Sequence, residues 1–190
     1  MFLHQAQYSD IKALLQPGDL FAFAGTGTVS ELIQEFTHSV VSHVGNVFDQ
    51  DGRMIQATTL NGHDGVAISH TTDELIRYPG RVWILRLAAD IRSRFNAAAY
   101  EDACLAQANR PYNYQGILNF AWRRVFPWAK DRGRHGMFCS QRTADAWMSA
   151  GVLPRTKEAS EYSPADIVGL SIYDRDYFQV IGEPMELAIH

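Results

Sequence analysis

The strongest constraint on the fold is a predicted β-hairpin in the first third of the chain. Two strand-like apolar runs, His43–Phe48 and Arg53–Thr58, are separated by four residues that end in Asp51-Gly52. Asp-Gly between such runs is typical of a hairpin turn. If the turn centres near residues 50 and 51, facing residues have numbers that sum to about 101. This register places His43 one same-face step from Gln56, so we expect both side chains on one face of the hairpin.

The pattern along the rest of the chain predicts an α+β fold. Apolar runs at 19–24, 66–68 and 82–87 predict three more strands, and 177–181 and 185–189 predict edge strands. Helical spacing and capping residues predict helices at 9–15, 30–36, from 71, 94–109, 116–126, 139–150 and from 163. Neighbouring strands with helices mostly segregated from them favour an antiparallel sheet packed against helices. At 190 residues, we expect residues 1–190 to form a single domain.

Composition and charge exclude several function classes. A net charge of −4 and a pI near 5.9 argue against binding nucleic acid through phosphate contacts. No apolar run is long enough for a membrane span, and the N-terminus lacks the pattern of a signal peptide. We therefore expect a protein that is cytoplasmic as synthesised, for which work outside the cell needs another route of delivery. The histidines and cysteines lack the tight spacing of a zinc site, so no metal is expected.

Cys139 is the best candidate for a reactive group. It opens an apolar-periodic segment in which Ala144, Trp147 and Met148 recur at helical spacing, and Gly151 supplies a stop. The first turn of a helix has free backbone N–H groups and the positive end of the helix dipole, which stabilise a thiolate. The alternative is that Cys139, like most lone cysteines, is a small buried apolar residue without a chemical role. Cys104, inside the predicted helix 94–109, fits that alternative.

His43 is the candidate base for this thiol, although by itself it is more often an ordinary strand-end histidine. A cysteine nucleophile needs an imidazole to move its proton and a third polar group to fix the imidazole tautomer. Gln56, across the predicted hairpin, can accept a hydrogen bond from the imidazole. Being neutral, it orients the ring without stabilising its charged form.

An aromatic segment that follows Pro111 offers a second idea. It contains Tyr112, Tyr114, Trp122 and Trp128, together with arginines, and such a mixture can form a membrane-surface or ligand-docking face. A core helix with an aromatic margin is the favoured alternative. The hydroxyl of Tyr112 or Tyr114 can still reach the active site, and we include both with Ser140 as substrate-binding candidates.

Taken in order, six short motifs resemble the permuted papain-like enzymes of the NlpC superfamily, particularly the YiiX-like group. The motifs are Pro17-Gly18-Asp19-Leu20-Phe21, Ser42-His43-Val44-Gly45, Ile55-Gln56-Ala57, Tyr112-Asn113-Tyr114, Phe138-Cys139-Ser140 and Ser163-Pro164-Ala165-Asp166. The resemblance implies a papain-like fold in which circular permutation puts the histidine strand before the cysteine helix. It also implies Cys139 as nucleophile, His43 as base and Gln56 as the orienting residue. The family commonly has glutamate at the last position and Ser-Glu where this chain has Ser140-Gln141.

The expected function is a cofactor-independent thiol hydrolase. It acts on peptide, isopeptide or peptidoglycan-peptide bonds through an acyl-enzyme, and the N–H of Cys139 contributes to the oxyanion hole. One alternative is an acyltransferase or esterase that acts on lipids. Another is a non-catalytic papain-like module that binds a wall fragment or belongs to a larger assembly, such as a phage particle or a secretion machine.

Overall fold

The computed structural model describes residues 1–59, 62–76, 78–113 and 137–181. Within them the chain forms a mixed seven-stranded sheet packed against helices, with strand order β1-β7-β6-β2-β3-β4-β5. The predicted helix 116–126 and edge strand 185–189 lie outside the described residues, as does Tyr114. The strands are β1 Phe2–Ala6, β2 Leu20–Ala24, β3 His43–Val47, β4 Arg53–Thr58, β5 Gly65–His70, β6 Arg81–Leu87 and β7 Tyr173–Val180.

The predicted hairpin is present with the predicted register. β3 and β4 pair antiparallel, with Gly45 facing Gln56 and Val47 facing Met54. β2 pairs with β3 on one side and with β6 on the other. Every residue of β2 is buried, because this central strand is covered on both faces.

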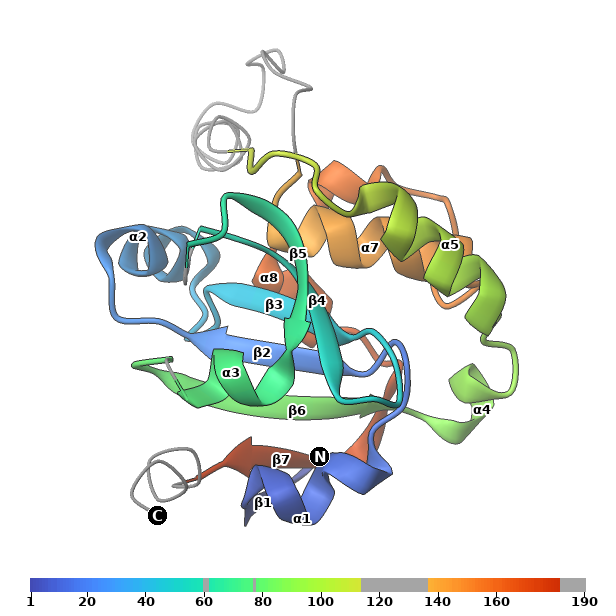
Figure 1. Cartoon of the computed structure of the whole chain (residues 1–190), viewed down its shortest axis with the longest axis horizontal. Helices are drawn as coiled ribbons and strands as arrows, with labels where there is room; N and C mark the ends of the chain where they lie inside the picture. Colours follow the sequence, from blue (N-terminus) through green and yellow to red (C-terminus); the bar gives the residue numbers. More distant parts are fainter. Residues whose placement is uncertain (60–61, 77, 114–136, 182–190) are drawn as a thin grey trace.

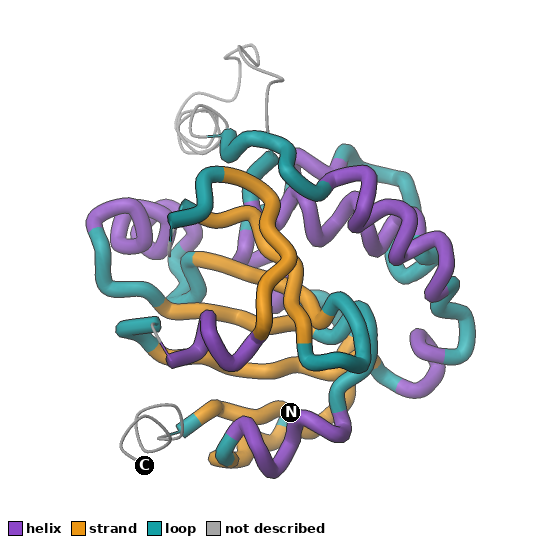
Figure 2. The backbone as a smooth tube through the Cα atoms, viewed as in Figure 1, coloured by secondary structure: helices purple, strands orange, loops and turns teal. Residues whose placement is uncertain are grey.

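The helices cover both faces of the sheet (Figures 1 and 2). The larger core joins one face of β2, β3 and β4 to α5 and α7, with Trp147 fully buried within it. The smaller core joins the opposite face to residues of α1 and α3. The helical segments are α1 Tyr8–Ile11, η1 Lys12–Leu14, α2 Thr28–Thr37, α3 Thr71–Ile76, α4 Ala89–Arg92, α5 Ala97–Gln107, α7 Cys139–Ser149, η2 Ala159–Glu161 and α8 Pro164–Val168.

Three features differ from the sequence expectations. The sheet is mixed rather than purely antiparallel, because β1 pairs parallel with β7 at one edge. The N-terminal strand was not predicted, since four of its five residues are exposed and show no alternation of apolar and polar positions. The predicted helix 94–109 begins later, at Ala97, where the side chain of Asn96 accepts from the N–H of Ala99 and caps it. A separate short helix, α4, precedes it.

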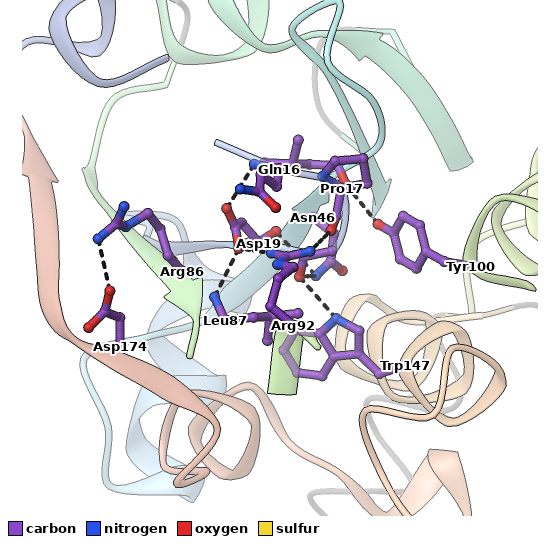
Figure 3. A network of polar contacts seen from close by, with 12 residues as sticks. Gln16, Pro17, Asp19, Asn46, Arg86, Leu87, Arg92, Tyr100, Trp147 and Asp174 are labelled. Carbon is purple, nitrogen blue, oxygen red and sulfur yellow. Dashed lines mark hydrogen bonds and ion pairs between the residues drawn. The ribbon is translucent and has the colours of Figure 1, made fainter. Parts of the chain in front are cut away.

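A buried polar network fixes the helices against the start of β2 (Figure 3). The carboxylate of Asp19 accepts hydrogen bonds from the N–H groups of Gln16 and Leu87, at 2.9 Å each, and pairs with the Arg92 guanidinium. The Trp147 indole of α7 donates to the Gly18 carbonyl at 3.0 Å. This network therefore fixes α7, the helix that begins with Cys139, against the sheet.

Candidate active site

Cys139 is the first residue of α7, as the sequence predicted. Phe138 is the N-cap residue, with extended backbone, and its carbonyl accepts the hydrogen bond of the Arg142 N–H. The first N–H groups of a helix have no acceptor within the helix, so they are available to a negative charge placed there. The sulfur thus lies where a helix favours a thiolate.

His43 and Gln56 meet across the hairpin. Nε2 of the imidazole lies 2.7 Å from Oε1 of Gln56. An amide oxygen only accepts, so Nε2 carries the hydrogen and donates it, which leaves Nδ1 of the neutral ring free to accept a proton. Gly45 faces Gln56, and a Cβ atom at position 45 would lie 3.2 Å from the Gln56 Cβ. The glycine therefore leaves the space in which the histidine and glutamine side chains meet.

Cys139 and His43 are neighbours, and each shifts the pKa of the other through charge and hydrogen bonding. Burial alone raises the pKa of the Cys139 thiol. The charge and hydrogen bond of His43, with the N–H groups of Val44 and Ser140, outweigh burial and lower the pKa below its ordinary value. For His43, burial lowers the pKa, but the charge and hydrogen bond of Cys139 and the contact with Gln56 raise it. The two shifts favour a thiolate–imidazolium pair.

Tyr78 is a neighbour of this pair that the sequence analysis did not identify. Its ring packs edge-on against Phe23, with centroids 4.8 Å apart, and Phe23 also lies against the His43 ring. Its hydroxyl shares a hydrogen bond with Ser42. Burial raises the pKa of Tyr78 to about 12, with a further contribution from the Cys139 charge. The phenol is therefore neutral at physiological pH and close enough to sense the thiolate.

A second polar cluster joins α7 to β3 beneath the pair. Asn46 of β3 and Thr143 of α7 are fully buried, and the Thr143 hydroxyl donates to Oδ1 of Asn46 at 2.8 Å. The Arg142 guanidinium donates to the same oxygen. The cluster connects the helix that carries the nucleophile to the strand that carries the histidine.

The remaining predicted site residues are placed differently. Ser140 is fully buried, and its hydroxyl donates to the Tyr162 carbonyl at 2.7 Å, so its side chain connects α7 to the loop after η2. Tyr112 is partly buried against the larger core and forms a β-bridge with Met137. The Ser140 hydroxyl is thus engaged with Tyr162, and the role of Tyr112 in substrate binding stays a prediction.

The described residues offer neither a cluster of metal-binding side chains nor a membrane-spanning helix. They contain no group of three or more histidine, cysteine, aspartate or glutamate side chains arranged to hold a metal ion. Among their helices, none combines the length and the apolar character needed to cross a bilayer.

Comparisons with known proteins reveal distant similarity. No protein-family model matches the sequence. The chain is 25% identical over 217 residues to the probable lipoprotein peptidase YaeF of Escherichia coli (strain K12), with 94% of this chain and 74% of that protein covered. The crystal structure of the metalloprotein YiiX from Escherichia coli O157:H7 matches with a TM-score of 0.48 and 16% identity, over 89% of each chain. The chain is thus similar in sequence to a protein named as a peptidase.

Proposed function

We propose that this protein is a thiol hydrolase that cleaves amide bonds in peptide-related substrates. Cys139 is the nucleophile, His43 the base and Gln56 the residue that orients the imidazole. One arrangement carries the proposal: Cys139 begins α7 next to His43, which interacts with the sulfur and whose Nε2 lies 2.7 Å from Gln56 Oε1. The similarity to a probable peptidase supports peptide-related substrates.

In the first half of the reaction the substrate acylates the Cys139 sulfur of the enzyme. The thiolate of Cys139 attacks the carbonyl carbon, and the carbonyl oxygen becomes an oxyanion that first-turn N–H groups of α7 stabilise. The His43 imidazolium then gives its proton to the leaving nitrogen. The carbon–nitrogen bond breaks, and a thioester to Cys139 remains.

In the second half, water releases the acyl group. His43, now neutral, removes a proton from a water molecule as its oxygen attacks the thioester carbonyl. The carbon–sulfur bond breaks, the acid product leaves, and the thiolate–imidazolium pair is restored. Gln56 accepts a hydrogen bond from the Nε2–H group throughout, which keeps Nδ1 available for proton transfer at the sulfur.

The order of the parts supports a papain-like fold that is circularly permuted, as in the NlpC superfamily. The histidine strand β3 precedes the cysteine helix α7 in the chain, and the hairpin partner β4 supplies the orienting amide. Helix α7 packs on one face of the sheet and contributes side chains to the larger core. This arrangement is the one that the ordered motifs imply.

The decisive experiment is digestion of a defined panel, read by mass spectrometry. The panel contains muropeptides, isopeptide-linked peptides and acyl esters of lipids. We expect new amine and acid termini with the wild-type protein and none with Cys139→Ala. Cys104→Ala is the matched control, because this cysteine is fully buried in α5 away from the pair, and it should digest the panel like the wild type.

The outcomes separate the proposal from its alternatives. Cleavage of esters without cleavage of any amide would assign the same site to lipids instead. No turnover of any substrate, with Cys139 reacting no faster than a free thiol, would contradict an enzymatic role and favour a binding module.

A further inference from the structure

Arg142 is a buried cation that the reaction described above does not use. Its side chain is fully buried on α7, one turn after Cys139. Its guanidinium donates to Asn46 Oδ1, to Thr143 Oγ1 at 3.0 Å and to the Cys104 sulfur at 3.8 Å. In the described part of the chain these partners are all neutral, and Nε has no hydrogen-bond partner.

A buried cation without an opposite charge beside it lowers the stability of a folded protein. A buried charge is normally paired with an opposite charge, and replacing a buried ion by a well-packed apolar side chain often stabilises a fold. The buried carboxylate of Asp19 in the same protein follows this rule, since it pairs with the partly buried Arg92. Arg142 departs from it, and it does so beside the candidate catalytic pair.

The contacts of Arg142 join the two elements that carry this pair. The guanidinium extends from α7, which begins with Cys139, to Asn46, which lies three residues after His43 on β3. Asn46 is itself held, since its amide donates to the carbonyls of Gly18 and Asp19. The positive charge is therefore fixed at the junction of helix and strand.

We propose that Arg142 is a positioning residue whose fixed charge holds α7 on β3 and sets the pH range in which the Cys139–His43 pair is active. This inference rests on the proposed function. It assigns to the guanidinium two separable effects, one on the geometry of the pair and one on its ionisation.

The direction of the ionisation effect follows from the sign of the charge. A nearby cation disfavours every protonated, more positive form, and the Arg142 charge lowers the pKa of His43. Removing the cation therefore raises both apparent pKa values of the coupled pair. On the other side of Arg142, Cys104 and Tyr100 of α5 feel the same charge, and Glu101 opposes it at Cys104.

The test follows the alkylation of Cys139 by iodoacetamide as a function of pH, without any substrate. The rate at the Cys139 peptide is read by mass spectrometry, which separates it from Cys104. We expect two steps in the wild type, one where the thiolate–imidazolium pair forms and one where the imidazolium loses its proton. In Arg142→Met both steps should move to higher pH by about one unit.

Three further variants distinguish the effect of the Arg142 charge from the effect of its packing. Asn46→Asp keeps an oxygen against the guanidinium but neutralises its charge, so both steps should again move to higher pH. Thr143→Val removes a neighbouring hydrogen bond to Asn46 without changing any charge. Thr143→Val should lower the alkylation rate of Cys139 and leave the pH of both steps unchanged. Arg142→Lys keeps the charge and should also leave them in place.

The inference and the proposed function fail in different ways. If wild-type Cys139 reacts like a free thiol at every pH, the proposed function is wrong. If the wild type shows both steps, and neither Arg142→Met nor Asn46→Asp moves them, the role of Arg142 is wrong. Thermal unfolding of each variant verifies that it is folded. Should Arg142→Met not fold, Asn46→Asp alone decides the question.

Discussion

The two cysteines of this chain are similarly buried but have different neighbours. Both are free thiols, both are buried, and both lie on helices that pack together in the larger core (Figure 1). Cys104 lies inside α5 and is 0% exposed, whereas Cys139 is the first residue of α7 and is 3% exposed. Burial alone therefore does not distinguish them.

Their ionisation differs in direction. Burial raises the pKa of Cys104, and the nearby Arg142 charge and the Tyr100 hydroxyl do not overcome it. For Cys139, a histidine that takes the proton and two backbone N–H groups do overcome burial. A fixed cation beside a buried thiol is thus insufficient. The activation that we propose for Cys139 requires a hydrogen-bonded base together with the start of a helix.

The largest expected effect comes from removing the base. In His43→Ala, Cys139 keeps its helix position but loses the imidazole, so it should behave more like Cys104. Since its pKa should rise toward the ordinary thiol value, alkylation at pH 6 should fall strongly. Turnover should fall by roughly 10²- to 10⁴-fold, the usual contribution of a general base. Site-resolved alkylation and substrate digestion measure the two effects.

Cys104 provides the control for this variant. Its alkylation should be equally slow in the wild type and in His43→Ala, because its surroundings are unchanged. If Cys139 alkylated at pH 6 as fast without His43 as with it, the activation assigned to the histidine would be refuted.

A smaller effect is expected at Gln56, which acts on the sulfur only through His43. Gln56→Ala removes the acceptor of the Nε2 hydrogen, so turnover should fall by about 10- to 100-fold as the ring loses its orientation. Gln56→Glu keeps the acceptor and adds a charge that stabilises the imidazolium. Turnover should be retained or raised, and the upper limb of the pH–rate profile should move to higher pH. Complete loss of activity in Gln56→Glu would show that the residue does more than orient His43.

The sequence predicted those parts of the site that depend on local structure. The Asp-Gly turn fixed the register of β3 and β4, and with it the meeting of His43 and Gln56. The helical spacing after Cys139 predicted that α7 begins there. Each conclusion needed only neighbouring residues and the geometry of one hairpin or one helix.

The parts that were missed depend on contacts between distant segments. β1 and β7 pair although one lies near the start of the chain and the other near residue 180, and the exposed β1 has no alternation to indicate it. Arg142 looks like an ordinary surface residue until α5 and β3 enclose it. Tyr78 follows a short helix and carries no motif. Position 142 lies off the stripe formed by Ala144, Trp147 and Met148, so the helical pattern gives no signal for the burial of Arg142.

The smallest expected effect on turnover comes from the tyrosine beside Cys139. Each cysteine has a tyrosine nearby, so the two tyrosines can be compared. Tyr78→Phe removes a neutral hydroxyl that contacts Ser42 and senses the Cys139 thiolate. Turnover should fall only a few-fold, with both limbs of the pH–rate profile unmoved, since a phenol with a pKa of about 12 does not titrate in that range. Steady-state rates between pH 5 and 9 measure this.

Tyr100→Phe is the matched control, because the Tyr100 hydroxyl donates to the Val47 carbonyl at 2.8 Å in the core. It should lower the free energy of unfolding by about 1 kcal/mol and leave turnover unchanged. If the two variants exchanged these effects, the hydroxyl beside Cys104 would be the one that matters for reactivity, and the contrast between the two cysteines would need another cause.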